Sequence, residues 1–259
     1  MNYFFRSFNF IAHFITARNT RGSGIHSPYL FDFVKYILEE KNPYYIYDKI
    51  KSQRAKLLNN NTLINKIDYG TGESKQISVS QIAAKSICTV REGELLCRIV
   101  NCLKLNSVLE LGTSFGISTA YIAALSKSRN CITLEGCKNT AQIARQTFLD
   151  LNLNNIEILI GNIDQTINIA IDKLSTIDFV YIDANHTFDA TIRYFDLILP
   201  KLSNNAVVVI DDIYWSVGMK KAWKNIQKNV KVTSSFDLYH FGILFFNPDL
   251  HKKNYKLRF

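Results

Sequence analysis

From residue 107 onward, short apolar runs alternate with stretches of helical periodicity, and this alternation constrains the fold more than any other feature of the sequence. The apolar runs are 108–111, 131–134, 156–160, 179–182 and 207–210, and the helical stretches between them are 118–127, 140–151, 163–173 and 189–199. Apolar strands separated by helices form βαβ units around a parallel sheet that is buried on both faces. We therefore predict a doubly wound, Rossmann-like α/β fold with a mostly parallel sheet of seven strands.

Both ends of the chain add to this α/β core. After a helix predicted around 217–229, two strand-like runs at 231–236 and 241–246 are separated by few residues, which favours an antiparallel C-terminal hairpin. The N-terminal part reads as helices and loops, including a helix that begins at Pro28, a position where proline fits the first turn. We predict a helical N-terminal extension or lid over 1–90, followed by the α/β domain over 91–259.

The formal net charge of +9 is concentrated at the two ends of the chain. Residues 1–66 contain ten Lys or Arg against four Asp or Glu, and residues 249–259 contain four against one. A basic flank is a weak indication of nucleic acid or another anionic partner. We interpret the excess as a solvated basic face and keep nucleic-acid binding as the alternative.

The N-terminal stretch is rich in aromatic residues, but Arg6, Asn9 and His13 interrupt it. Because it has no continuous apolar segment it does not resemble a signal peptide, and apolar runs such as 206–210 are too short to span a bilayer. Four apolar residues recur at helical spacing: Phe4, Phe8, Ile11 and Ile15. We predict that this stripe packs on the parent domain, with docking on a membrane surface or on a partner, including a homodimer, as the alternative.

Five cysteines occur in the chain: Cys88, Cys97, Cys102, Cys131 and Cys137. The odd count and the absence of a CxxC pair argue against a disulfide framework or a zinc site. We expect reduced, mostly buried thiols in a cytoplasmic protein.

The first strand of the α/β domain runs into a glycine-containing turn at 110–118, which reads Glu-Leu-Gly-Thr-Ser-Phe-Gly-Ile-Ser and precedes a helix. Gly112 and Gly116 allow the backbone to turn sharply and a ligand to approach it closely. The N–H groups at the start of the following helix favour an anionic ligand group such as a carboxylate. The spacing is GxxxG rather than GxGxxG, so the turn alone does not identify a nucleotide site.

Polar residues at three further strand ends fall on the same predicted edge of the sheet, where open α/β sheets bind ligands. Glu135 ends the second strand, and its carboxylate would accept hydrogen bonds from ribose hydroxyls. Gly161 and Asn162 follow the third strand, near the expected place of an adenine ring, and Asp183 follows the fourth. Together the four strand ends predict a site for a nucleotide-like cofactor.

Residues 107–247 resemble class I S-adenosylmethionine (SAM)-dependent methyltransferases, in particular the metal-dependent O-methyltransferases of the catechol and macrolide-sugar types. The turn at 110–118 resembles that family's first motif, E-x-G-x-x-x-G-x-S, and Gly24-Ile25-His26-Ser27-Pro28 resembles a group of uncharacterised bacterial methyltransferases. The resemblance implies that the turn surrounds the methionine part of SAM and that Glu135 binds the ribose. The family often has an acidic residue where this chain has Asn162, whose amide carbonyl still accepts a hydrogen bond from adenine. The cofactor-binding residues expected on this basis are Glu110, Gly112, Thr113, Ser114, Gly116, Ser118, Glu135, Gly136, Asn162 and Asp183.

A second set of candidate residues follows the fourth and fifth strands: Asp183 and His186, and the pair Asp211-Asp212. If these strands are neighbours, three carboxylates converge on one rim, where a cation is needed to offset their repulsion. Mg²⁺ prefers such oxygen ligands, and the resemblance implies that Asp183, Asp211 and Asp212 bind it. His186 stands where catechol-type enzymes place a catalytic lysine, so we predict a general base, with a structural histidine as the alternative. Trp215 is expected to pack its helix on the sheet, with lining of the acceptor pocket as the alternative.

These residues predict an O-methyltransferase for a small hydroxylated molecule, in which Mg²⁺ lowers the pKa of the acceptor hydroxyl and His186, beside Asp183, removes its proton. An RNA methyltransferase is one alternative, although the fourth strand is followed by Asp-Ala-Asn-His and not by the Asn-Pro-Pro-Tyr of adenine-N6 enzymes. A nicotinamide-dependent enzyme is disfavoured by the missing third glycine and the terminal hairpin. A non-catalytic scaffold with the same fold is the remaining alternative.

Overall fold

The computed structural model describes residues 3–67 and 74–259. The sequence pattern at 68–74 predicts a turn-rich loop, most of which lies outside the described residues. The chain divides into two compact units, unit 1 (Met1–Glu40 and Thr176–Phe259) and unit 2 (Lys41–Ser175). These divisions reflect compactness. The predicted boundary at residue 90, between a lid and a catalytic domain, remains a prediction.

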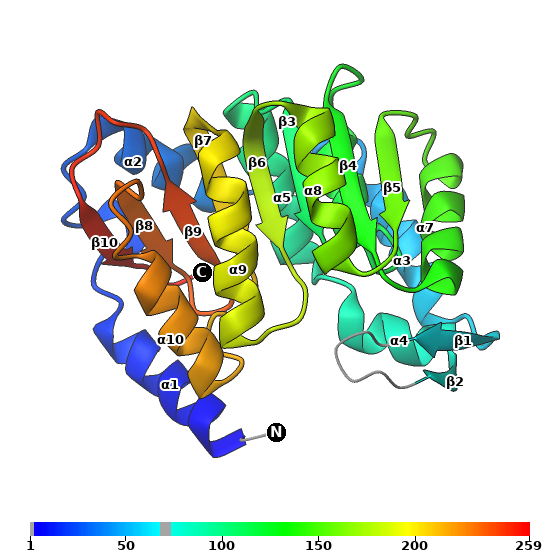
Figure 1. Cartoon of the computed structure of the whole chain (residues 1–259). Coiled ribbons are helices and arrows are strands. Elements are labelled where there is room, and N and C mark those ends of the chain that lie inside the picture. The colour runs from blue at the N-terminus through cyan, green and yellow to red at the C-terminus, as the bar shows by residue number, and fades with distance from the viewer. Residues whose placement is uncertain (1–2, 68–73) are drawn as a thin grey trace. The chain divides into compact units, whose positions relative to one another are not determined.

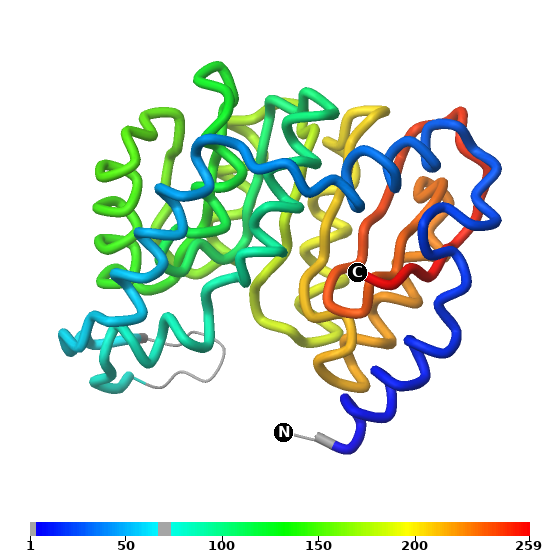
Figure 2. The backbone as a smooth tube through the Cα atoms, turned by 180° about the vertical axis from the view of Figure 1, so that it is seen from behind, coloured from blue at the N-terminus to red at the C-terminus, as the bar shows by residue number. Residues whose placement is uncertain are grey.

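Unit 2 is built on three parallel strands in the order β3-β4-β5. Helix α8 covers β3 and β4 on the side seen in Figure 1, and α3 and α5 lie on the opposite side, which faces the viewer in Figure 2. Its elements are α3 (Tyr47–Leu58), β1 (Leu63–Ile67), β2 (Ser74–Ser78), α4 (Val79–Ser86), α5 (Val90–Cys102), β3 (Ser107–Leu111), α6 (Ile117–Ala123), β4 (Asn130–Glu135), α7 (Lys138–Asp150), β5 (Ile156–Ile160) and α8 (Ile163–Leu174).

Local sequence explains where several of these helices begin. Capping boxes start two of them: Ser78 with Gln81 at α4, and Thr89 with Glu92 at α5. In each box a side-chain oxygen accepts a backbone N–H that has no partner within the helix, and the third helical residue reaches back to the cap. The sequence pattern predicts helices at roughly 78–88 and 92–103, and the bounds of α4 and α5 confirm both to within a few residues.

Unit 1 contributes five strands to the sheet in the order β10-β8-β9-β7-β6. Strands β6 and β7 are parallel, β9 runs antiparallel to both β7 and β8, and β10 runs parallel to β8. Its elements are α1 (Tyr3–Thr16), η1 (Thr20–Gly22), α2 (Pro28–Phe33), the π-helical η2 (Val34–Leu38), β6 (Ile177–Ile182), α9 (Phe188–Ile198), η3 (Leu199–Lys201), β7 (Leu202–Ile210), α10 (Val217–Ile226), β8 (Ser234–Asp237), β9 (Gly242–Phe245) and β10 (Lys253–Lys256).

The predicted fold class is confirmed, including the mostly parallel sheet, the N-terminal helices and the antiparallel pairing of β8 with β9. The predicted number of seven strands is one too few for this sheet, because the described residues include β10 at its edge. That strand reads Lys-Asn-Tyr-Lys, and only Tyr255 in it is buried. A four-residue edge strand with one apolar residue leaves no periodic signal in the sequence.

The predicted packing of the α1 stripe on the parent domain is wrong. Phe4, Phe8, Ile11 and Ile15 expose 90%, 72%, 58% and 69% of their surface. The face that packs on unit 1 is the polar one, which carries buried Asn9 and His13. Amphipathic periodicity shows that a helix has an apolar face, but not which face the protein covers.

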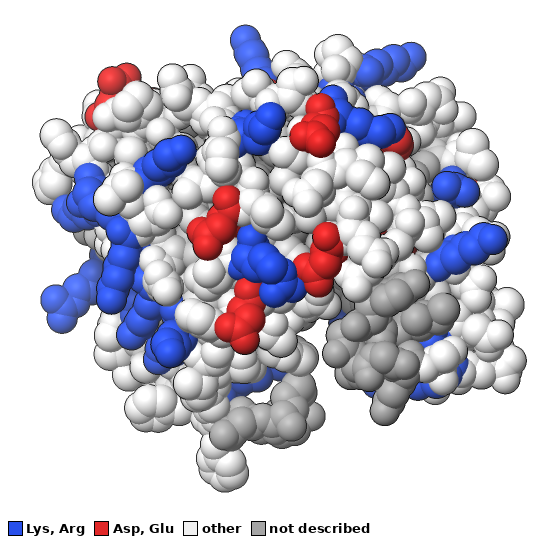
Figure 3. Space-filling view, in the orientation of Figure 1, with Lys and Arg blue, Asp and Glu red and all other residues white. Residues whose placement is uncertain are grey.

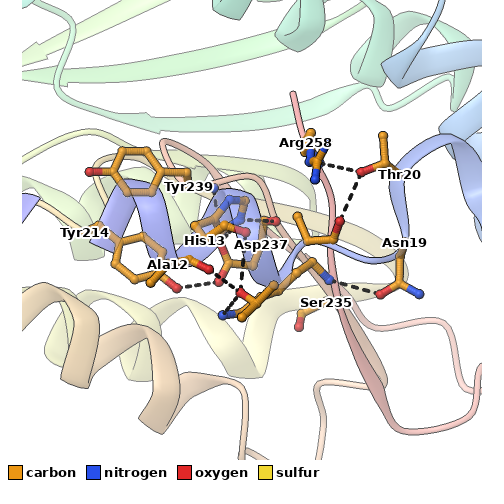
Figure 4. A network of polar contacts seen from close by, with 12 residues as sticks. Ala12, His13, Asn19, Thr20, Tyr214, Ser235, Asp237, Tyr239 and Arg258 are labelled. Atoms are coloured by element: carbon orange, nitrogen blue, oxygen red, sulfur yellow. Dashed lines mark hydrogen bonds and ion pairs between the residues drawn. The ribbon is translucent and has the colours of Figure 1, made fainter. Parts of the chain in front are cut away.

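Figure 4 shows the contacts that fix this polar face. His13 Nε2 lies 3.1 Å from Asp237 Oδ1, and the hydroxyl of Tyr214 donates a 2.7 Å hydrogen bond to Asp237 Oδ2. Burial alone would raise the pKa of the Asp237 carboxyl, but His13, Tyr214 and the backbone N–H of Tyr239 outweigh it and lower that pKa. A charged, fully hydrogen-bonded carboxylate at the end of β8 therefore anchors α1.

The thiols agree with the expected reduced state. All five cysteines are free, and three of them, Cys97, Cys131 and Cys137, are buried. In the described part of the chain, no helix combines the length and the apolar character that crossing a bilayer would require.

Candidate cofactor and acceptor sites

The turn between β3 and α6 has the backbone geometry that the glycine spacing predicts. Gly112 and Gly116 have φ angles of 102° and 78°, and Ser114 between them has a φ of 47°. A Cβ atom at Gly116 would lie 2.4 Å from the ring of Phe148, so both the space and the φ angle require glycine there. Gly116 is also the N-cap of α6, so the turn delivers the chain directly to a helix N-terminus.

Glu110 at the end of β3 is completely buried and binds hydroxyl groups of the protein itself. Its carboxylate accepts hydrogen bonds from Ser118 (2.7 Å), Thr133 (2.6 Å) and Thr119. These donors come from α6 and β4, so one carboxylate ties three elements together beneath the turn. Glu110 and Ser118 therefore shape the site from below. Sequence reasoning missed Thr119 and Thr133, since neither belongs to a recognisable motif.

Glu135 at the end of β4 is held by backbone N–H groups from two turns. Ser114 N donates to Oε2 and Cys137 N to Oε1, each at 2.9 Å. Burial raises the pKa of Glu135, against the opposing effect of these two N–H donors. The Glu135 carboxylate therefore joins the β3 turn to the β4 turn, and Gly136 separates Glu135 from Cys137 in the chain. Thr113 completes the link, since its hydroxyl lies 2.6 Å from that of Thr133.

Asn162 lies at the third strand end, where it caps α8. Its side-chain carbonyl accepts a 3.0 Å hydrogen bond from Asp164 N, and Gly161 before it has a φ of 144°. The amide oxygen that was expected to meet adenine is thus engaged in a cap. Unit 2 places Asn162 one strand further along the sheet than Glu135.

Unit 1 brings the other candidate residues together at the ends of β6 and β7. His186 Nε2 lies 3.4 Å from Asp183 Oδ1, and the imidazole ring is 6.0 Å from the indole of Trp215. Burial alone would lower the pKa of His186, but hydrogen bonding to Asp183 and the negative charges of Asp183 and Asp212 outweigh it, so the pKa is raised. The pair has the geometry of a base oriented by a carboxylate.

Asp211 and Asp212 have different surroundings although they are adjacent. Asp211 accepts 2.7 Å hydrogen bonds from the Tyr181 hydroxyl and from the backbone N–H of Asp212. Asp212 is half-buried with a φ of 52°; burial and the charge of Asp183 raise its pKa, while His186, Arg6 and His240 lower it. A residue other than glycine with a positive φ is in a rarely populated conformation, and such residues are frequent at functional sites.

These carboxylates do not form the expected metal site in this arrangement. Among residues 3–67 and 74–259, no group of three or more His, Cys, Asp or Glu side chains surrounds a point where a metal ion would bind. Both oxygens of Asp211 are directed to protein donors, and Asp183 contacts His186. The residues present therefore do not fit Mg²⁺ as they stand, and we assign no chemical step to it.

Arg6 of α1 is a further residue at this rim that sequence reasoning did not identify. Its guanidinium carbon lies 4.5 Å from the centre of the Trp215 ring, and its charge acts on Asp212. Trp215 is 36% exposed, so it is not the packing residue that we expected. No spacing rule relates Arg6 to Trp215, because they are joined only through tertiary structure.

A parallel α/β sheet, a left-handed glycine turn leading into a helix and a carboxylate at the end of the next strand define the Rossmann-like class to which the class I methyltransferases belong. Residues 109–213 match the family model described as a methyltransferase domain. This match confirms the predicted resemblance to methyltransferases over that part of the chain.

Two curated proteins are similar to parts of the chain. Catechol O-methyltransferase of Mycobacterium tuberculosis is 26% identical over 132 residues, which is 48% of this chain and 56% of that protein. The tRNA (guanine-N(7)-)-methyltransferase of Mycoplasma mobile is 31% identical over 81 residues, or 31% of this chain and 40% of that protein. The chain thus spans only about half the length of the curated relatives that it matches.

Solved structures with the same fold include two O-methyltransferases. The enzyme from Bacillus cereus, in complex with S-adenosylhomocysteine (SAH), has a TM-score of 0.57 and 20% identity, covering 83% of this chain and 96% of that one. The enzyme from Streptomyces achromogenes, in complex with SAM, has a TM-score of 0.57 and 17% identity, covering 82% of this chain and 93% of that one. At these identities the likeness establishes the fold.

Proposed function

We propose that this chain is a SAM-dependent O-methyltransferase that acts on a small hydroxylated molecule. The observation that carries the proposal is the turn from Gly112 to Gly116, with its left-handed backbone and the Glu135 carboxylate bonded to its centre, inside a matched methyltransferase domain. The SAM and SAH complexes of the structurally similar O-methyltransferases support this choice of cofactor.

The proposed cofactor residues have distinct tasks. The N-terminus of α6 and the N–H groups of the turn bind the methionine carboxylate, because both favour negative charge. Glu135 accepts hydrogen bonds from the ribose, and Asn162 adjoins the adenine. Glu110, Thr113 and Ser118 hold the turn in shape. SAM bound there supplies an electrophilic methyl group.

In the proposed reaction, His186 is the general base for the acceptor hydroxyl. A neutral imidazole that directs its Nε2–H towards Asp183 leaves Nδ1 to accept the hydroxyl proton. Asp183 fixes the ring and stabilises the imidazolium that forms. The acceptor oxygen takes the methyl group, SAH leaves, and the proton passes from His186 to water. Trp215 and Arg6, which belong to the same unit as His186, are proposed to contact the acceptor.

Divalent-metal assistance stays a prediction from the resemblance, and the observed carboxylate arrangement does not support it. Methyl transfer measured in a chelator, with and without added Mg²⁺, tests it directly. A turnover that collapses in chelator and returns with Mg²⁺ would require Asp183, Asp211 and Asp212 to rearrange on metal binding.

Calorimetric titration with SAH, followed by transfer of labelled methyl from SAM to a panel of phenols, catechols and sugars, tests the proposal. We expect one saturable site, weakened about tenfold in Glu135→Gln because a hydrogen bond to a charged group is lost. His186→Ala should bind SAH as the wild type does while losing transfer. SAH binding without transfer to any hydroxyl would reject the O-methyltransferase assignment.

RNA is the second candidate acceptor, favoured by the net charge of +9 and by the partial similarity to a tRNA methyltransferase. Labelled transfer to total tRNA that weakens steeply with salt would establish it, because phosphate contacts release counterions. The reduced thiols accord with a cytoplasmic location, which we include in the proposal.

A further inference from the structure

Helix α1 carries a concentration of exposed apolar side chains that no other element matches. Of its large apolar residues, Phe4, Phe8, Phe10, Ile11, Phe14 and Ile15 are at least half exposed. Every other helix or strand in the described part of the chain contributes at most one exposed large apolar side chain. Single exposed apolar residues are ordinary, whereas six on one short helix mark a docking surface.

The apolar face is held outward by the contacts on the opposite face. Asn9 accepts a hydrogen bond from Lys220 of α10, and His13 is paired with Asp237 of β8. The hydroxyl of Tyr239 donates a 2.7 Å hydrogen bond to the carbonyl of Arg6. Since these polar contacts attach α1 to unit 1, burying the aromatic face against the same unit would require breaking them.

Positive charge gathers at the C-terminal end of the exposed face. The sequence has no Asp or Glu before Asp32, and Arg18 and Arg21, just beyond α1, are exposed. The Arg258 guanidinium carbon lies 3.9 Å from the centre of the Phe14 ring, and Lys256 Nζ lies 3.3 Å from Thr16 Oγ1. Figure 3 shows basic side chains gathered over the part of unit 1 that holds α10 and β10.

We propose that α1 is an interfacial helix that docks unit 1 on an anionic membrane surface. Its 14 residues, about 21 Å long, lie flat at the headgroup boundary with the Phe and Ile side chains among the acyl chains. The flanking Arg and Lys side chains bind lipid phosphates. Charge favours this occupant over a second copy of the chain. The cations beside the exposed face attract an anionic surface, whereas a second copy would bring the same positive charge.

Co-sedimentation with vesicles of phosphatidylcholine, alone or mixed with phosphatidylglycerol, tests the proposal. We expect binding to the mixed vesicles that weakens with salt, and far less binding to phosphatidylcholine alone. Phe8→Ser/Ile11→Ser should weaken binding at least about tenfold, because two apolar side chains no longer enter the lipid. Arg18→Glu/Arg21→Glu should weaken binding only to the mixed vesicles.

Val230→Ser is the matched control, since Val230 is 92% exposed in the same unit but outside α1. It should bind vesicles as the wild type does, and circular dichroism and SAH affinity should be unchanged in all variants. Absence of binding to the mixed vesicles overturns the proposal. So does a dimer, measured by light scattering, that Phe8→Ser/Ile11→Ser dissociates without any vesicle binding in the wild type.

Discussion

The carboxylates Glu110 and Glu135 of unit 2 have more hydrogen-bond donors from the protein than the carboxylates Asp183 and Asp212 of unit 1. Glu110 accepts hydrogen bonds from three hydroxyls, and Glu135 from two backbone N–H groups. In unit 1, burial and the charge of Asp183 raise the pKa of Asp212, and both carboxylates lie beside His186. Saturated carboxylates make a rigid frame, whereas a half-buried cluster of Asp and His retains the capacity to exchange a proton. This difference supports the proposal that the unit 2 residues bind the cofactor and that His186 of unit 1 acts as the base.

The largest effect on SAH affinity is expected for a change in the Gly112–Gly116 turn of unit 2. Gly116→Val places a side chain against Phe148 at a φ of 78°, and overpacking and backbone strain each cost about 1–3 kcal/mol. We expect SAH affinity to fall by two orders of magnitude or more and the urea midpoint to drop. Gly218→Ala is the control, because its nearest neighbour would be 3.5 Å from the added Cβ. Full SAH affinity in Gly116→Val would show that the turn does not form the cofactor site.

A change at His186 should affect turnover without affecting cofactor binding. His186→Ala removes the proposed base, so turnover should fall by about 10²–10⁴-fold while SAH affinity stays at the wild-type value. Single-turnover methyl transfer and calorimetry measure the two quantities. If turnover is unchanged, His186 is a structural residue and the base lies elsewhere.

The pH profile sharpens the same contrast. A base must be neutral to accept a proton, so activity should rise as the pH increases through the pKa of His186. Because Asp183 and Asp212 raise that pKa, the pH at which activity rises should lie above about 6.5, the ordinary pKa of histidine. In Asp212→Asn one of these charges is gone, so the rise in kcat/KM should move to lower pH. If the rise stays at the same pH, a group other than His186 titrates.

Loss of one hydroxyl partner in the frame should have a moderate effect. Thr133→Val keeps the shape of the side chain but removes a donor to buried Glu110, which costs about 1–3 kcal/mol of the free energy of unfolding. Urea denaturation measures the loss. Thr147→Val, at a buried threonine bonded only to its own helix, should cost less. Equal losses of unfolding free energy in both variants would show that the hydrogen bond to Glu110 adds no special stability.

A feature could be predicted from the sequence when it depends on neighbouring residues in the chain. Features that depend on contacts between distant segments were missed. The strands β3 to β7 were predicted because each contains a short apolar run, although β5 at the sheet edge is only partly buried. The glycine turn was predicted because its backbone requires Gly112 and Gly116. The β1–β2 ribbon was missed because Ser-Lys-Gln-Ile-Ser has an exposed, polar pattern. Glu110 was read as a cofactor ligand because its hydroxyl partners are scattered along the chain.

The anchoring of α1 was also beyond the sequence pattern. Its apolar periodicity is real, but His13 and Asp237 decide which face is covered, and they meet only through the folding of β8. These two residues are far apart in the sequence, so no local pattern could show their contact.

The smallest effect on stability is expected for the contact between His13 and Asp237. Asp237 has a lowered pKa, so its stabilising contribution is present above about pH 4, the unfolded value, and is lost as the pH falls through the folded pKa. His13→Gln should cost about 1 kcal/mol near neutral pH and reduce this acid-dependent loss, measured by urea denaturation at several pH values. An unchanged pH dependence would contradict the anchor.

The central claim is that the turn leading into α6 binds SAM, and isothermal titration of the purified chain with SAH tests it most directly. The account predicts one saturable site that is retained in His186→Ala and lost in Gly116→Val. Wild-type protein that is folded by circular dichroism but binds neither SAH nor SAM would contradict it.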